Sequence, residues 1–381
     1  MKITTYSAQS AQDMANILAQ HAFQFVSVHM NCALDAAPLR DLSHIPALHG
    51  ATSCLGAMTN VGTNNGVVAF AIDDAEGAYG TAMVPYENDP QEAARQATLK
   101  ALSRADRMGE RPEIIWVSGT PGVEEAVLAG IESVTGTDVP IIGGSAADNS
   151  VAGDWFVFDD TLHSQAGVVV SVLFPSAPVS FAYQNGYSPT AHSGVVTQVE
   201  GRRIKQIDGR PALDVYSGWT GGQVVADPAM TEPQTILSAS TLWPLGREIA
   251  QVGDVPFYLL AHPAMAQMGG EMDLFATVDQ GETLTLMSGT IEGLVDRAGR
   301  VATLARASGR AADRPIAGAL MIYCGGCMLT VRDELPKVVK GVDAALDGAP
   351  FAGAFTFGEQ GALVGAGNRH GNLMISCIVF G

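Results

Sequence analysis

The sequence predicts an α/β protein in which mixed and antiparallel sheets are layered with helices. Three observations predict this fold class: a recurring order of strand, helix, glycine-broken strand and closing strand; alanine and leucine at helical spacing in 89–108; and alternating strands after residue 179. Helix crossovers are typical of parallel strands and tight turns of antiparallel strands, so both kinds of pairing are expected. We expect two related halves that contain these internal repeats.

The recurring unit is clearest near the C-terminus. An apolar strand at 317–326 leads to a helix at 328–350, the segment FAGAFTFGEQGALVGAGNRHGNLMIS at 351–376, and a closing strand at 371–380. Three imperfect copies of this order indicate internal duplication. The other two copies comprise 23–32 with 48–72, where Gly50 corresponds to Gly353, and 112–119 with 120–136, 139–149 and 166–174.

Capping residues predict where two helices begin. The helix in 89–108 is expected to start after Asp89 as N-cap, with Pro90 in its first turn. Thr120 and Pro121 are expected to begin the helix of the middle copy in the same way.

A run of proline and serine at 175–193 predicts the domain boundary. It divides the chain into an N-terminal half of residues 1–188 and a C-terminal half of residues 189–381. Asp208 precedes a glycine and is expected to be a turn residue in the second half.

Composition narrows the function classes. The formal net charge is −18 and no basic run is present, which argues against nucleic acid or an anionic membrane as a partner. No apolar run approaches the roughly 18 residues of a membrane span, and the N-terminus lacks the apolar region of a signal peptide. Five cysteines, an odd number, favour free thiols in a reducing compartment. We therefore expect a cytoplasmic protein.

Four segments together resemble the FIST sensory domain family, with its N- and C-terminal halves. The resemblance covers nearly the whole chain. The matching segments are VPIIGGSAADN at 139–149, RIKQIDGRPALDVY at 203–216, ALMIYCGGC at 319–327, and FAGAFTFGEQG with RHGNL between 351 and 373.

The resemblance implies a bacterial signal-transduction input module that binds a small ligand. Family members are fused to, or encoded beside, histidine kinases, chemoreceptor output domains and cyclic-di-GMP enzymes. A subset of stand-alone members of about this length is similar to nitric-oxide-sensing haem proteins. The chain is therefore expected to regulate a separate histidine kinase or cyclic-di-GMP enzyme. Haem is one candidate cofactor, and a homodimer is one candidate assembly.

Glycine-rich loops are the first candidate ligand contacts. Gly143, Gly144 and Ser145 follow a strand, and Gly353 and Gly358 stand in an equivalent frame. Glycine lets a ligand approach the backbone, and successive free N–H groups can hold an anion. The alternative is that these glycines permit bulges or tight sheet packing.

Two acids follow these glycines. Glu359 and Asp148 either bind a ligand ammonium group or cap exposed backbone N–H groups. With the family resemblance, Glu359 is expected to line the pocket. Asn372, in the turn that closes the same segment, belongs to the predicted site.

Cys324 and Cys327 form a C-x-x-C between a strand and a helix. That context is typical of thioredoxin-like redox motifs, in which the helix N-terminus lowers the pKa of the first thiol. A thiol oxidoreductase is therefore the alternative function, with small core residues or metal ligands as further interpretations. Cys324 is also a candidate ligand contact.

Histidines bear on the haem hypothesis because haem iron commonly takes a proximal imidazole. His370, beside the glycine loop, and His192 are the candidate iron ligands, whereas His29 is expected in the core and His262 in a loop.

The sequence contains no G-x-S-x-G, P-loop or H-E-x-x-H motif, and no catalytic residue is predicted. A third hypothesis is that the protein is a hydrolase or transferase whose active-site residues are dispersed along the sequence.

Overall fold

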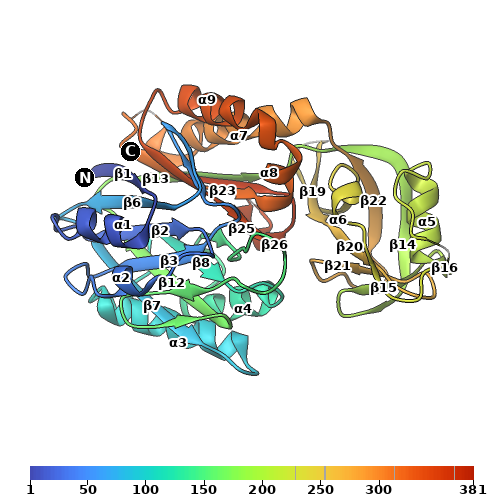
Figure 1. Cartoon of the computed structure of the whole chain (residues 1–381), viewed down its shortest axis with the longest axis horizontal. Coiled ribbons are helices and arrows are strands. Elements are labelled where there is room, and N and C mark those ends of the chain that lie inside the picture. Colours follow the sequence, from blue (N-terminus) through green and yellow to red (C-terminus); the bar gives the residue numbers. More distant parts are fainter. Residues whose placement is uncertain (228, 253–254, 313, 364) are drawn as a thin grey trace.

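Three copies of one α/β unit and an inserted sheet make up the chain (Figure 1). The structure is a computed structural model that describes residues 1–227, 229–252, 255–312, 314–363 and 365–381. Each unit runs as strand, helix, central strand, crossover, parallel strand, hairpin and closing strand. The predicted α/β fold class, with mixed and antiparallel sheets, is confirmed.

The first two units are consecutive in the chain. The first comprises β1 (Lys2–Ala8), α1 (Ala11–Leu18), β2 (Phe25–Met30), α2 (Ala37–Arg40), β3 (Leu48–Thr52), β4 (Ala57–Thr59), β5 (Gly62–Asn64) and β6 (Val67–Asp73). The second comprises β7 (Ala78–Pro85), α3 (Pro90–Arg104), β8 (Ile114–Gly119), α4 (Glu124–Thr135), β9 (Ile141–Gly144), β10 (Val157–Phe158), β11 (His163–Ser164) and β12 (Gly167–Phe174).

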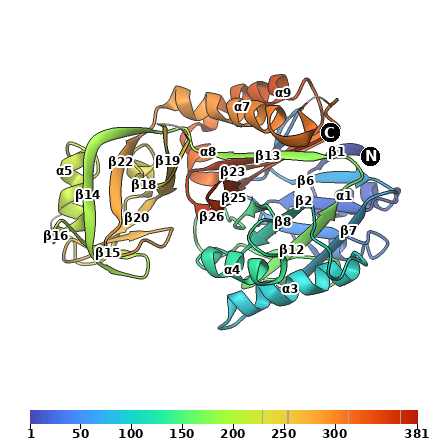
Figure 2. The same ribbon diagram turned by 180° about the vertical axis from the view of Figure 1, so that it is seen from behind.

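The third unit is interrupted after its first strand, and Figure 2 shows the chain passing from that strand into the inserted sheet. The third unit comprises β13 (Val179–Gln184), α7 (Ile291–Ala307), β23 (Gly318–Cys324), α8 (Gly325–Thr330), α9 (Leu335–Ala345), β24 (Phe351–Thr356), β25 (Glu359–Leu363), β26 (Gly367–Gly371) and β27 (Ile375–Phe380).

The inserted sheet is antiparallel and encloses a hydrophobic core of its own beneath α5. It comprises β14 (Ser188–Glu200), β15 (Arg203–Ile207), β16 (Arg210–Pro211), α5 (Ala212–Trp219), β17 (Gln234–Thr235), α6 (Leu237–Ser240), β18 (Leu245–Val252), β19 (Val255–Ala261), β20 (Pro263–Ala266), β21 (Met272–Leu274) and β22 (Thr283–Ser288).

Strand register makes the three units equivalent. In each unit the central strand pairs in parallel with the strand after its crossover, and antiparallel with the closing strand. The matching parallel pairs Val26–Leu48, Ile115–Ile141 and Ala319–Phe351 place Gly50, Gly143 and Gly353 at one position. The predicted equivalence of Gly50 and Gly353 is therefore confirmed.

Each hairpin leaves its own unit and extends the sheet of another. The hairpin β4–β5 pairs with β24, β10–β11 pairs with β3, and β25–β26 pairs with β9. Two of the shared glycines make room for these hairpins. A Cβ on Gly50 would lie 2.2 Å from the Phe158 ring, and one on Gly353 would lie 2.6 Å from the Met58 methyl group. These glycines therefore serve close sheet packing, one of the two interpretations of the glycine pattern.

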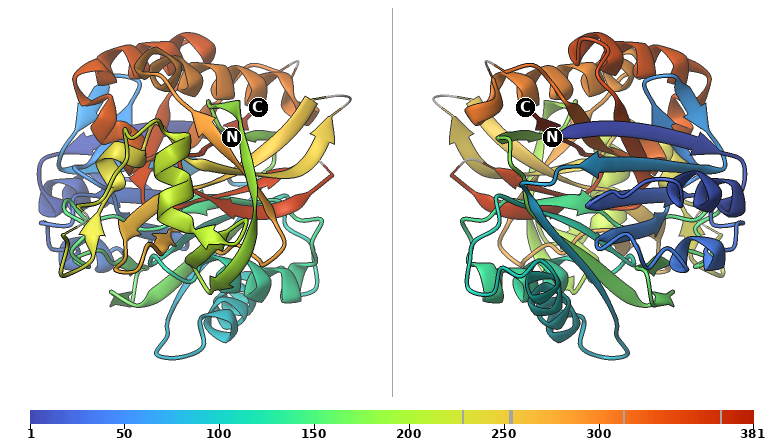
Figure 3. Two further views of the ribbon diagram at one scale, coloured as in Figure 1. Left: turned by 90° about the vertical axis from the view of Figure 1, so that its right-hand side faces the viewer. Right: turned by 90° about the vertical axis from the view of Figure 1, so that its left-hand side faces the viewer.

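The inner faces of the three sheets share one core, to which Phe25, Trp116, Leu320 and Phe380 contribute. Alternate residues of the same strands point outward and pack beneath helices, because successive side chains of a strand face opposite sides. The end views show the helices at the periphery of the three-sheet body, with α7 and α9 on one side and α3 and α4 on another (Figures 1 and 3).

Helix starts agree with the capping prediction in one case and differ in another. Asp89 caps α3 as predicted, and its side chain accepts the Glu92 N–H at 2.9 Å. The prediction that Thr120 caps α4 is wrong, since α4 begins at Glu124. Gly122, at φ 108°, turns the chain out of the helical path before that point.

The helix expected at 328–350 is divided. It consists of α8, which ends at Thr330, and α9, which begins at Leu335. Pro336 lies in the first turn of α9, where its missing N–H costs no helical hydrogen bond.

Within the described ranges, no helix has the length and apolar character needed to cross a membrane.

We expect Gly50→Ala to lower the free energy of unfolding by about 1–3 kcal/mol, because the added methyl group collides with the buried Phe158 ring. Chemical denaturation measures this. Gly218→Ala in α5 is the matched control, since a Cβ there meets nothing within 4 Å, and it should be neutral or stabilising by up to about 1 kcal/mol. Equal stability of the two variants would contradict the role assigned to Gly50.

Candidate functional site

A cavity of about 500 Å³ lies where the inserted sheet meets the three-sheet body. It sits beyond the carboxyl ends of the parallel strands, a common place for ligand sites in α/β proteins. Its wall consists of Cys54, Asn149, Ser150 and Val151 from the first two units, Cys324, Gly326, Leu329, Thr330, Phe357 and Asn372 from the third, and Thr235, Leu237, Ser238, Thr241, His262 and Phe275 from the inserted sheet.

Two of the residues predicted to contact a ligand, Cys324 and Asn372, line this cavity. The others support it from behind or lie elsewhere, and sequence reasoning did not single out Cys54, Asn149, Phe275 or Phe357. The predicted residues outside the wall are Gly143, Gly144, Ser145, Asp148, Gly353, Gly358, Glu359, His370 and His192.

Asp148 shapes the cavity rim without facing the cavity. Its buried carboxylate accepts backbone N–H groups from Ser150, Ala152, Gly153 and Asp154 at 2.7–3.0 Å. Burial raises the pKa of Asp148, but these hydrogen bonds outweigh it, and the pKa lies below its usual value. The carboxylate is thus occupied as a loop cap, and the loop it holds presents Asn149 and Val151 to the cavity.

The turn at Asn372 carries a free hydrogen-bond donor. Asn372 Oδ1 accepts the His262 backbone N–H at 3.1 Å, whereas Nδ2 is buried and has no partner among the described residues. The next residue, Leu373, has φ 56°, a conformation that side chains of its kind rarely adopt. Such strain persists only where the surroundings hold it, and it is common at functional sites.

Two buried side chains hold this turn. Arg297 Nη1 donates to the Leu373 carbonyl at 2.8 Å, and Glu359 Oε2 accepts the Met374 N–H at 3.0 Å. The other carboxyl oxygen of Glu359 accepts the Thr356 hydroxyl at 2.9 Å. Burial raises the pKa of Glu359 well above its usual value, so the group is neutral. Glu359 therefore positions Asn372 and carries no charge for a ligand ammonium group.

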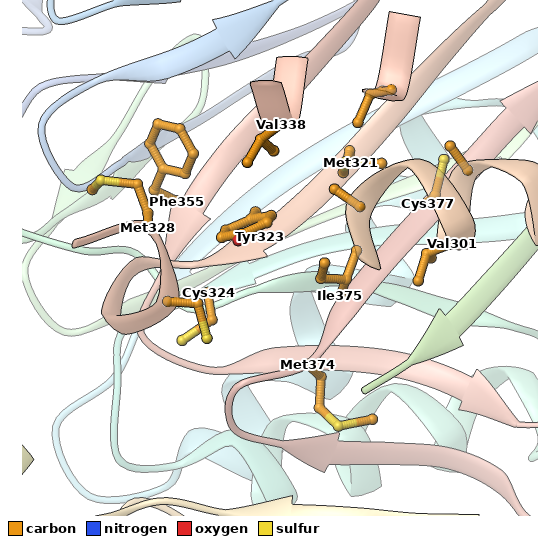
Figure 4. Close-up of a cluster of buried hydrophobic side chains, with 14 of the residues drawn as sticks. Val301, Met321, Tyr323, Cys324, Met328, Val338, Phe355, Met374, Ile375 and Cys377 are labelled. Atoms are coloured by element: carbon orange, nitrogen blue, oxygen red, sulfur yellow. The ribbon is translucent and has the colours of Figure 1, made fainter. Parts of the chain in front are cut away.

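The C-x-x-C belongs to the same buried cluster as Met374, the residue after Leu373, and Figure 4 labels Cys324 and Met374. Cys324 lines the cavity and is 6 % exposed, and Cys327 is fully buried. A hydrogen bond with Cys327, together with burial, raises the pKa of Cys324 well above its usual value. Burial also raises the pKa of Cys327, but the Cys324 hydrogen bond and the Arg297 charge bring it down to about 6. The low pKa thus belongs to the second thiol, because the buried cation adjoins it.

The two histidines expected to bind haem iron, His370 and His192, do not line the cavity. His192 lies exposed on β14, away from the cavity. His370 is buried, with Nδ1 3.4 Å from Gln360 Nε2 and Nε2 3.3 Å from the Phe275 carbonyl. His262, expected in a loop, is the histidine in the cavity wall. Its Nε2 lies 3.2 Å from the Leu237 carbonyl, and burial lowers its pKa to about 4, so the imidazole is neutral.

Comparison with family models settles the membership of this chain. A FIST N domain model matches residues 20–210, and a FIST C domain model matches residues 212–362. The chain belongs to the FIST family. FIST domains are generally sensory domains of signal transduction proteins and bind small ligands. The two halves expected from the sequence match these two family domains.

Other comparisons add no functional assignment to this FIST protein. No curated protein matches the sequence. Among solved structures, cyanuric acid hydrolase from A. caulinodans is similar at 9 % identity over 99 % of this chain and 97 % of that chain, with a TM-score of 0.36. Within the described residues, no group of three or more His, Cys, Asp or Glu side chains is arranged to hold a metal ion.

A polar network beside the cavity connects the three-sheet body to the inserted sheet. Arg202, in the turn before β15, donates to Glu124 at 2.7 Å and to Glu125 at 2.6 Å. Glu125 also accepts the Thr277 N–H at 3.0 Å, and Ser145 donates to Glu124 at 2.8 Å. Thus Ser145, one of the predicted ligand contacts, instead supports the junction between the two parts.

Gly358 and His370 belong to the same junction. A Cβ on Gly358 would lie 2.7 Å from the His370 ring and 3.2 Å from Glu124. The glycine therefore lets the imidazole pack close to the carboxylates, and His370 Nε2 lies 3.9 Å from Glu124. The two residues hold the junction together and stay outside the cavity.

We expect Arg202→Ala to destabilise the protein by about 2–4 kcal/mol, because Glu124, only 4 % exposed, would keep a buried carboxylate without its cation. Arg203→Ala is the matched control. Arg203 pairs with Asp273 within the inserted sheet and is 43 % exposed, so its loss should cost less than about 1 kcal/mol. Urea denaturation of both variants compares the two losses, and equal losses would contradict this assignment.

The contribution of Arg202 to the free energy of unfolding should depend on pH. Burial raises the pKa of Glu125, but His370 and Arg202 lower it to about 2, and they also hold the pKa of Glu124 below its usual value. A carboxyl group with a depressed pKa stabilises the folded state above its unfolded pKa, near 4.5, and loses that contribution as the pH falls toward its folded pKa. The stability difference between wild type and Arg202→Ala should therefore shrink between about pH 5 and pH 2. A difference that is constant across this range would contradict the pairing.

Proposed function

We propose that this FIST protein is an input module whose ligand occupies the 500 Å³ cavity and is small, uncharged and largely apolar, with one hydrogen-bond acceptor. The observation that carries the proposal is the buried Asn372 Nδ2, which lacks a partner among the described residues, in a wall that exposes mostly apolar surface. A buried donor without a partner costs about 1–3 kcal/mol. An acceptor on the ligand would recover that energy once a small shift of the Asn372 turn exposes Nδ2 to the cavity.

The absence of charge in the wall supports a neutral ligand. No Lys, Arg, Asp or Glu is found among the described residues that line the cavity, and His262 is neutral. Leu237, Phe275 and Phe357 supply apolar surface. A charged ligand would lose its hydration shell without gaining a counter-ion, which is unfavourable.

The position of the cavity supports a signalling role. Its wall includes residues of the three-sheet body and of the inserted sheet, so a ligand contacts both parts at once. A ligand shifts a protein only by binding one arrangement of its parts better than another. We infer that occupancy changes the angle of the inserted sheet, which a separate histidine kinase or cyclic-di-GMP enzyme reads in the cytoplasm.

Haem does not fit this cavity. Its two propionates need cationic partners, and none is found among the described lining residues. His370 and His192, the histidines expected to bind iron, lie outside the wall, and among the described lining residues His262 is the one histidine. We therefore do not extend the proposal to haem-based sensing of nitric oxide, and protein purified with haem supplied should show no Soret band.

A fragment screen tests the proposal. We expect neutral fragments that carry a carbonyl or ether oxygen to raise the melting temperature and to shift NMR signals of cavity residues. Asn372→Asp keeps the oxygen that accepts the His262 N–H but removes the Nδ2 donor. It should weaken binding about tenfold, the value of one hydrogen bond of about 1.4 kcal/mol.

A second variant fills the cavity. A Cβ on Gly326 would make ordinary contacts of 3.7 Å with Cys324 Sγ and 3.7 Å with the His262 ring, so Gly326→Phe extends into the empty space. Binding should be lost while the fold is retained, and Gly218→Ala should bind as wild type does. Fragments that bind Gly326→Phe unchanged, or charged fragments that bind best, would overturn the proposal.

A further inference from the structure

We propose that Cys324 and Cys327 form a peroxide-reactive dithiol, in which a small hydroperoxide entering the cavity converts the pair into an intramolecular disulfide. This is a second input of the protein, and it does not depend on the proposed neutral ligand. It also differs from a thiol oxidoreductase for protein substrates, since Cys324 is 6 % exposed and Cys327 is fully buried.

The first support is a buried cation that lacks a carboxylate. Arg297 is 1 % exposed, and no ion pair joins it to an Asp or Glu of the described residues. Its guanidinium group makes one hydrogen bond, to the Leu373 carbonyl, and its Nε and Nη2 atoms have no partner in the described part of the chain. An unpaired buried charge is costly, so this arginine requires an anion beside it.

Cys327 is the group that can supply this anion. Burial favours the neutral form of the nearby Glu359, and the Arg297 guanidinium carbon lies over the rings of Tyr187 and Tyr323, 5.6 and 5.3 Å from their centroids. Cys327 Sγ lies 3.5 Å from the Tyr187 hydroxyl, which also contacts the Thr241 carbonyl at 2.8 Å. The Arg297 charge thus stabilises a thiolate at Cys327, and a thiolate is the reactive form of cysteine.

The two sulfur atoms have complementary positions. Cys324 faces the cavity, so a small molecule reaches it first, whereas Cys327 lies behind it next to Arg297. The interaction between the two thiols raises the pKa of Cys324 and lowers that of Cys327, so the pair holds one proton between them. When that proton moves to Cys327, the thiolate charge moves to Cys324 at the cavity wall.

The chemistry balances with a hydroperoxide as the oxidant. The Cys324 thiolate attacks the terminal oxygen, the O–O bond breaks, and the leaving alkoxide takes the proton from Cys327 to become an alcohol. Cys324 is then a sulfenic acid and Cys327 a thiolate. The Cys327 thiolate attacks the Cys324 sulfur, the S–S bond forms, and hydroxide leaves and takes up the proton that the pair released to solvent when the thiolate formed, which gives water. Two thiol sulfurs are oxidised, and one peroxide is reduced to an alcohol and water.

Oxidation of the two thiols should change the conformation of the Asn372 turn, because Arg297 contacts both the thiol pair and this turn. The disulfide is uncharged, so Arg297 loses its anion. Arg297 also holds the Leu373 carbonyl at 2.8 Å, next to Asn372 in the cavity wall. We therefore expect the oxidised protein to present Asn372 differently from the reduced protein.

Peptide mass spectrometry after titration with tert-butyl hydroperoxide tests the proposal on the full chain. Wild type should lose two hydrogen atoms in the peptide that contains Cys324 and Cys327. Cys327→Ser should stop at a sulfenic acid on Cys324 that dimedone traps, and Cys324→Ser should give neither product. Cys377→Ser, which removes another fully buried thiol, should behave as wild type.

The pH dependence provides a second measurement that needs no variant. Because the pKa of Cys327 is about 6, the oxidation rate should rise roughly tenfold between about pH 5 and pH 7. Cys32, which is partly exposed, is the internal comparison, since burial raises its pKa. The proposal is overturned if the pair remains reduced when Cys32 is already modified, or if the rate rises only at alkaline pH as for an ordinary thiol.

Discussion

Backbone pairing between units is the interaction on which the rest of the structure depends. Because each hairpin extends the sheet of another unit, the three sheets are joined in a ring and their inner faces share one core. This ring sets the carboxyl ends of the parallel strands side by side, so loops from all three units meet at the cavity. A ligand site at this place is a property of the assembled ring, since no single unit contains its wall.

Arg297 is the second constraint, because one buried guanidinium group serves two neighbours. It holds the strained turn at Leu373, and its charge adjoins Cys327. The energetic cost of burying this cation is offset only when both contacts are present. The hydrogen-bond donor of Asn372 and the reactive thiol pair therefore depend on the same side chain, although they lie on different segments of the chain.

The repeats could be predicted from sequence because each copy carries an apolar strand that ends at glycine. The exchange of hairpins could not, since nothing local in 358–371 indicates which sheet that hairpin joins. Cys324 and Asn372 could be placed near a site because they follow strand ends of one unit. His262 and Phe275 could not, because they come from the inserted sheet. The family resemblance favours Glu359 as a pocket residue, whereas its position among buried apolar residues keeps it neutral, and it supports the Asn372 turn from behind.

The exchange of hairpins also has a consequence for biosynthesis. Ala57 pairs with Ala354, 297 residues later in a chain of 381, and β27 lies between β13 and β23 in the interior of its sheet. A ribosome releases the first unit long before the strands that complete it. Until β24 emerges, β4 has an open edge, and β13 has one until β27 emerges; such edges favour association with other chains. Contacts this distant in sequence also slow folding. The nascent protein therefore has a long interval in which a chaperone that covers strand edges would be of most use.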